Sequence, residues 1–243
     1  MIIDEGSPFR RLPSELDRRQ ALFLDGIRYS VEMADLAHTR LRQTLFDIAK
    51  EQNRGAQANH WSLVSAVQDA WSVVDSLHRL RGLLDQMPGS KKKGPGLQVF
   101  VRTTTGIEDL RNAVQHLNHE IDGLVARNQP VWGSLSWFAA LDPFNNFGAS
   151  CSLITGTLFV KAASAPMIMP EGEVDLPVNL IVLSAYGHSL NLSDAMRRVA
   201  RLIAGMENEL KEQFSGYSTA GADLITCVGL QFGGGEPEEA ADS

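Results

Sequence analysis

Cysteine is scarce in this sequence. The chain of 243 residues contains two cysteines, Cys151 and Cys227, which lie far apart and form no CxxC pair. Both stand in apolar surroundings typical of strands, so we expect buried thiols of a protein from a reducing compartment. A secreted scaffold held by disulfides and a zinc site built from cysteines are therefore excluded.

Long hydrophobic runs are also missing. The N-terminal stretch MIIDEGSPFRRLPSELDRR has no apolar segment of signal-peptide length. The longest apolar runs, such as LIVLSAY, are far too short to cross a bilayer. We therefore expect a cytoplasmic protein with no membrane partner.

An excess of positive charge is absent as well, because the net charge is -7 and the pI is near 5.4. This balance argues against bulk electrostatic binding of nucleic acid, although a local basic patch remains open. The loop from Pro88 to Gly96 carries the run Lys91-Lys92-Lys93. Such a run is usually only solvated, and the alternative is contact with a phosphate backbone, which makes these lysines candidate RNA-binding residues.

Apolar residues at alternating steps of three and four predict four helices. The first begins near Pro13-Ser14-Glu15 and has the seam of a long helix packed against a neighbour. The third ends or kinks at Pro130. The predicted helices run from about Pro13 to Gln52, His60 to Met87, Ile107 to Asn128 and Asn191 to Phe214.

The pattern changes to alternation in the second half of the chain. Cys151–Ala163 and Val174–Tyr186 are rich in β-branched residues and predict an antiparallel hairpin with a long loop. Ala222–Phe232 is a candidate third strand, and the segment from Val131 to Pro143 is a candidate short helix.

A sheet of two or three strands is not stable alone in water and must pack on the helices. We therefore predict a mainly α protein of the α+β class. It is a four-helix bundle with a small antiparallel β-hairpin or three-stranded sheet inserted before the last helix, at about residues 150–187. Residues 1–232 are expected to form one domain, and residues 233–243 a flexible acidic tail.

The third predicted helix carries an unusual polar strip within the stretch IEDLRNAVQHLNHEI. On a helical wheel its polar residues lie away from the apolar seam, and those four apart stack along one line. These residues are Arg111, Asn112, Gln115, His116, His119 and Glu120. The strip is either a solvated helix face or a site.

Arg111 and His116, with the polar Asn112 directly after the arginine, form an R-x4-H motif. This motif resembles the signature of HEPN domains (higher eukaryotes and prokaryotes nucleotide-binding). Members are all-helical bundles, often dimeric, and many are metal-independent endoribonucleases of toxin–antitoxin, CRISPR and antiphage systems. The resemblance implies that Arg111 and His116 are the catalytic pair, with Asn112 as their polar neighbour and with no cofactor. His119 and Glu120 are candidate supporting residues on the same strip.

The implied chemistry suits these residue types. When the 2′-hydroxyl of RNA attacks the phosphate, a histidine with a pKa near neutrality moves the protons, and an arginine holds the phosphate as charge builds. Residues five apart on a straight helix do not point at one spot. A homodimer that joins two strips across a two-fold axis would repair this, so RNA is the expected substrate and an antitoxin a possible protein partner.

Two other interpretations of the same residues stay open. His116 and His119, three residues apart with Glu120 adjacent, could be a metal-binding pair, but a third protein ligand at an obvious spacing is missing, so we expect no metal site. Alternatively, the protein is a non-enzymatic helical scaffold or partner-binding protein whose first helix assembles with another subunit. His38 on the first seam is expected to be buried and hydrogen-bonded to a neighbouring helix.

His78 and Arg81 interrupt the apolar stripe of the second predicted helix. They mark either the place where that helix reaches the rim of the bundle or a polar pocket shared with His116.

Overall fold

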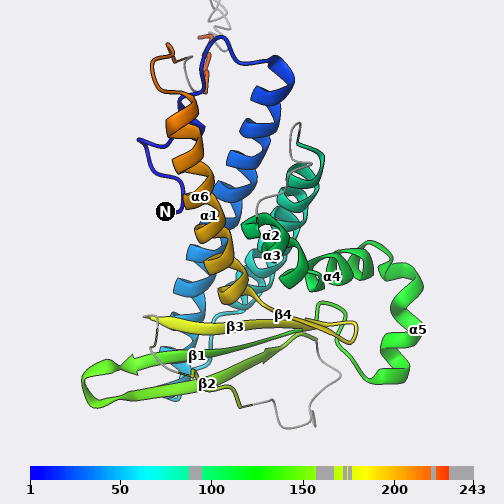
Figure 1. Cartoon of the computed structure of the whole chain (residues 1–243). Coiled ribbons are helices and arrows are strands. Elements are labelled where there is room, and N and C mark those ends of the chain that lie inside the picture. Colours follow the sequence, from blue (N-terminus) through cyan, green and yellow to red (C-terminus); the bar gives the residue numbers. More distant parts are fainter. Residues whose placement is uncertain (88–94, 157–166, 172–173, 175–176, 220–222, 230–243) are drawn as a thin grey trace, which may run out of the picture.

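Two long helices form the frame of the fold in a computed structural model that describes residues 1–87, 95–156, 167–171, 174, 177–219 and 223–229 (Figure 1). Helix α1 spans Arg18–Asn53 and α2 spans His60–Gln86. Each begins at a side-chain cap, because Asp17 accepts hydrogen bonds from two backbone amides of α1 and Asn59 accepts one from α2. Both predicted helices are confirmed, but α1 begins at Arg18 because Asp17 supplies its cap.

The sheet has four antiparallel strands in the order β2-β1-β3-β4. It begins earlier in the chain and ends later than the predicted insertion. Its strands are β1 (Ser134–Asp142), β2 (Phe147–Ile154), β3 (Val178–Ala185) and β4 (His188–Asn191).

The predicted hairpin is wrong because β2 and β3 do not pair with each other. Both pair with β1, which occupies the segment predicted as a short helix between Val131 and Pro143. Strand β1 is central and has buried residues on both faces, among them Leu135 and Ser136. A strand buried on both sides loses the alternation that marks a half-exposed strand, so periodicity alone cannot separate it from a buried helix.

The third predicted helix is also interrupted. It forms two helices, α4 (Gly106–Gln115) and α5 (Leu117–Arg127), which His116 separates with φ -100° and ψ 24°. A further short helix, α3 (Pro95–Thr103), precedes them. Figure 1 shows α5 at the edge of the molecule, running in a different direction from α4. Neither proline nor glycine marks this break. Along the apolar seam Leu110 of α4 is buried, Ile121 is exposed and Leu124 of α5 is buried again.

The last helix, α6 (Leu192–Gln213), is confirmed close to its predicted bounds. Asn191 caps it by accepting a hydrogen bond from the amide of Asp194 at 2.9 Å. The described residues thus form six α-helices, two short 3-10 turns at Pro8–Arg10 and Pro143–Asn145, and the sheet. The α+β class is confirmed, whereas a simple four-helix bundle is not.

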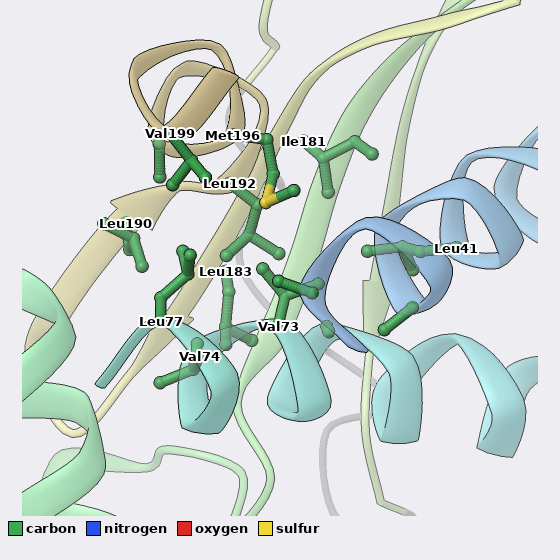
Figure 2. Close-up of a cluster of buried hydrophobic side chains, with 14 of the residues drawn as sticks. Leu41, Val73, Val74, Leu77, Ile181, Leu183, Leu190, Leu192, Met196 and Val199 are labelled. Carbon is green, nitrogen blue, oxygen red and sulfur yellow. The ribbon is translucent and has the colours of Figure 1, made fainter. Parts of the chain in front are cut away.

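The core lies where α1, α2 and α6 meet the sheet, and Figure 2 shows side chains from all of these elements pointing toward one another. Leu77 of α2, Leu183 of β3 and Val199 of α6 are all fully buried. Apolar contact across these elements therefore fixes the sheet on the helices. The labelled members are Leu41, Val73, Val74, Leu77, Ile181, Leu183, Leu190, Leu192, Met196 and Val199.

Several expectations concern the chain's C-terminal part and its cysteines. Residues 223–229 form no strand, so the candidate third strand is wrong over this range. Cys227 is exposed and Cys151 half-buried, so the expected burial of both thiols is also wrong. Three predicted features lie outside the described residues: Lys91-Lys92-Lys93, the part Thr157–Ala163 of the first predicted strand, and the tail at residues 233–243. No helix among the described residues is long and apolar enough to cross a membrane.

His38 lies against the core on α1, but its predicted hydrogen bond to a neighbouring helix is not made by Nε2. This atom is buried and has no hydrogen-bond partner among the described residues. Burial lowers the pKa of His38 to about 4, helped by Arg42 and Arg197 and opposed by Asp35. The native state therefore holds this imidazole neutral.

This buried histidine predicts acid sensitivity. Between pH 6.5 and about 4 the unfolded chain takes up a proton at His38 that the native state refuses. As the pH is lowered through this range, the free energy of unfolding should therefore decrease, by up to about 1.4 kcal/mol per pH unit. Urea titrations from pH 7 to 4.5 should show a shallower fall in His38→Gln than in the wild type. The exposed His60→Gln is the control, and an unchanged slope in His38→Gln would contradict the assignment.

Candidate functional site

Arg111 of the predicted strip is engaged by another helix. Its Nε donates to Oδ1 of Asp75 on α2 at 2.9 Å, and Arg79 donates to the other oxygen of the same carboxylate at 2.8 Å. Burial raises the pKa of Asp75, but the hydrogen bonds from Arg111 and Arg79 outweigh it and hold that pKa below its ordinary value. Arg111 thus helps to hold α4 on α2.

The other strip residues are separated by the break at His116. Asn112 ends up in α4, His119 and Glu120 in α5, and His116 between the two helices. The side chains of Asn112, His116 and His119 are exposed and make no side-chain hydrogen bond to the described residues. Glu120 accepts a hydrogen bond from Arg127 at 3.3 Å. The two parallel lines expected on one straight helix are therefore not formed.

Arg81 is a structural residue in this arrangement. Its guanidinium is buried and donates to the carbonyl of Val101 and to Oγ1 of Thr104, both at 2.6 Å, and to Glu108 at 2.9 Å. These bonds join α2 to the corner between α3 and α4. Nδ1 of His78 is buried without a partner among the described residues. No hydrogen bond among the described residues joins His78 or Arg81 to His116.

A hollow lies between α1 and α2, lined by side chains of both helices. It has a volume of about 1140 Å³ and is closed at one end by Trp132 and by the end of β2. Its walls are mainly apolar, and several of its large side chains keep 40–58% of their surface exposed. We call it the α1–α2 groove. Its principal apolar residues are Met33, Leu36, Val64, Val67, Trp71 and Trp132.

The groove exists because each long helix has a second apolar face. On α1, exposed apolar residues recur at steps of seven, four and three, outside the buried seam. They are Leu22, Tyr29, Met33 and Leu36. On α2, Val64 and Trp71 line the groove, and Trp71 also packs against the core. Periodicity detects an apolar face and cannot say whether the protein itself covers it.

Two arginines at the rim of the groove are paired with aspartates. Arg40 forms an ion pair with Asp69, and Arg79 pairs with Asp75 at 2.8 Å. The indole Nε1 of Trp71 donates to the carbonyl of Trp132 at 3.2 Å, which fixes the loop before β1 over the groove. The chain can turn there because Gly133 has a φ of +75°. A segment that enters the groove would therefore be bound mainly by its apolar side chains.

A second, smaller hollow of about 360 Å³ is polar and lies where α4, β4 and the start of α6 meet. Nδ1 of His188 stands 3.8 Å from Asp109, and both side chains are about half exposed. Among the described residues no group of three or more histidine, cysteine, aspartate or glutamate side chains could hold a metal ion. In this hollow an exposed histidine therefore stands beside an exposed aspartate.

No protein-family model, curated protein or solved structure matches this chain. The function must therefore be argued from the geometry of its own residues.

The role of Arg81 gives a prediction about the corner that supports α4. Arg81→Met removes three hydrogen bonds at a buried position and leaves the Thr104 hydroxyl only its bond to the carbonyl of Phe100, so we expect a loss of about 3 kcal/mol in the free energy of unfolding. Arg79→Met removes an exposed pair on the same helix and should cost less than about 1 kcal/mol. Urea denaturation measures both, and equal losses would show that Arg81 does not hold this corner.

Proposed function

We propose that the protein is a non-enzymatic, partner-binding helical protein whose α1–α2 groove takes up an apolar peptide segment. The observation that carries this proposal is the set of large apolar side chains left open around one hollow. Met33 is 46% exposed, Leu36 58%, Val64 40% and Trp132 48%. A soluble chain rarely gathers such residues at one place unless a partner covers them.

The energy of covering these four side chains supports a contact that is reversible. Burying a whole aliphatic or aromatic side chain contributes about 1.5–3 kcal/mol, so four half-exposed ones contribute on the order of 3–6 kcal/mol. Association costs oppose this gain. The groove therefore favours a partner that adds contacts beyond these four residues.

The shape of the groove favours a peptide over a small molecule. Its volume of about 1140 Å³ exceeds the range of about 300–1,000 Å³ that is usual for small-ligand sites. Small-ligand sites also contain a few converging polar groups that orient the ligand. Here the charged groups at the rim, Arg40 and Arg79, are already paired with aspartates.

Peptide selection tests this function. A library of displayed peptides panned on the protein should yield apolar sequences that bind with micromolar affinity and shift the tryptophan emission to the blue, because Trp71 and Trp132 line the groove. Val64→Asp places a charge in the groove and should weaken these peptides at least tenfold. Val125→Asp, on the exposed side of α5, is the matched control. Peptides that bind Val64→Asp as well as the wild type would contradict this function.

RNA cleavage by a HEPN-like mechanism is the second candidate. Its support is the R-x4-H motif together with the open position of His116 and the Nη groups of Arg111, which make no hydrogen bond to the described residues. A histidine free to exchange protons and an arginine with donors to spare are what such a reaction needs. In this proposal a second copy supplies the facing pair, and His119 and Glu120 remain supporting residues.

The RNA hypothesis has its own test. The purified protein should cleave single-stranded RNA in the presence of EDTA, and His116→Ala should slow cleavage by at least about 100-fold. His60→Ala removes an exposed histidine elsewhere and should leave the rate unchanged. Intact RNA and unharmed cells with the wild type would end this hypothesis without affecting the peptide-binding proposal.

A further inference from the structure

Residues 223–229, with the sequence DLITCVG, expose an unusual amount of apolar surface. Leu224 is 87% exposed, Ile225 85% and Val228 84%, and the segment forms no helix or strand. The sequence has no charged residue between Asp223 and Glu236. We call residues 224–229 the C-terminal apolar segment. Three neighbouring apolar side chains with so much exposed surface indicate a site that contacts a partner.

The start of this segment is held in one place. Asp223 receives two hydrogen bonds from the guanidinium of Arg28, at 2.6 and 3.2 Å, and one from the hydroxyl of Tyr29 at 2.6 Å. The hydrogen bond from Arg28, and then that from Tyr29, hold the pKa of Asp223 far below its ordinary value. Arg28 is buried, and its guanidinium carbon lies 4.3 Å from the centre of the Tyr29 ring. The carboxylate therefore stays charged and attached to α1 at any ordinary pH.

This anchor lies beside the groove. Tyr29 and Met33 are four residues apart on α1, so they share one face and are separated by about 6 Å along the helix. The exposed apolar stripe of α1 thus runs without interruption from the anchor into the groove. The side chains of Leu224, Ile225 and Val228 are nevertheless open, so the segment does not occupy the groove of its own chain.

We propose that the C-terminal apolar segment of one copy docks in the α1–α2 groove of a second copy. This inference rests on the proposed peptide-binding function and names its ligand. The lengths agree, because six extended residues span about 20 Å and α2 rises about 18 Å between Leu63 and Asp75. The chemistry agrees as well, because an uncharged apolar segment meets a floor whose charged neighbours are already paired.

A two-fold arrangement makes the exchange reciprocal. Each copy gives one segment and receives one, and the outer stripe of α1, with Leu22 and Tyr29, faces the same stripe of the other copy. The two groove contacts and the contact between the two α1 stripes then form one interface around the two-fold axis. An interface of standard size buries about 800 Å² on each partner, and a continuous patch of this kind can supply such an area.

Sedimentation velocity with paired variants tests this exchange. The wild-type protein should dimerise, and Val64→Asp in the groove or Ile225→Asp in the segment should each weaken the dimer at least tenfold. An equimolar mixture of the two variants should recover dimers, because the Val64→Asp chain still has an intact segment and the Ile225→Asp chain an intact groove. Val125→Asp should dimerise like the wild type. A wild type that stays monomeric at 100 μM, or a mixture without recovery, would overturn the proposal.

Disulfide trapping then identifies the contact. In a Cys151→Ala background, Val64→Cys should form a disulfide with the natural Cys227 of another copy under mild oxidation, giving a band of doubled mass without reductant. Val125→Cys should not. A disulfide within one chain would overturn the exchange between copies. If selected peptides still bind the groove while neither test gives a dimer, the peptide-binding function stands and its proposed ligand is wrong.

Discussion

The close packing of α1 against α2 is the constraint on which the other features depend. Alanines at the contact, including Ala34, Ala37, Ala66 and Ala70, are almost completely buried and let the two backbones approach closely. Because the helices are long and contact each other along narrow stripes, each has a further apolar face. One apolar face of each helix packs on the sheet and on α6 and forms part of the core. The other face, beside the loop before β1, stays open and forms the groove.

The sequence predicts the parts of this frame whose signals are local. Helices α1, α2 and α6 follow from apolar steps of three and four, and α6 begins within one residue of its predicted start at Asn191. Strand β1 could not be predicted, because a central strand with both faces buried has no alternation to detect. The break at His116 has no local signal either. Leu110 before it and Leu124 after it both reach the core, so burial of the seam does not reveal the break.

The candidate sites show the same limit. Spacing alone puts Arg111 and His116 on one strip, but Asp75 of α2 binds the arginine, and the chain turns at the histidine. Helical spacing places Val64 and Trp71 of the groove on one stripe with the buried Val74, so periodicity alone cannot separate the groove from the core. The pair of Arg28 with Asp223 joins residues almost the whole chain apart. Such partners become visible only when the fold brings them together.

The central claim is that the open apolar face of α1 and α2 is a surface that an apolar segment covers. The emission of Trp71 and Trp132 in a Trp61→Phe, Trp137→Phe protein reports on this face most directly, because both remaining indoles line the groove. As the protein is concentrated from 0.1 to 100 μM, their emission should shift to the blue and acrylamide quenching should fall. Emission and quenching that stay constant over this range would show that no segment of a second copy covers the groove.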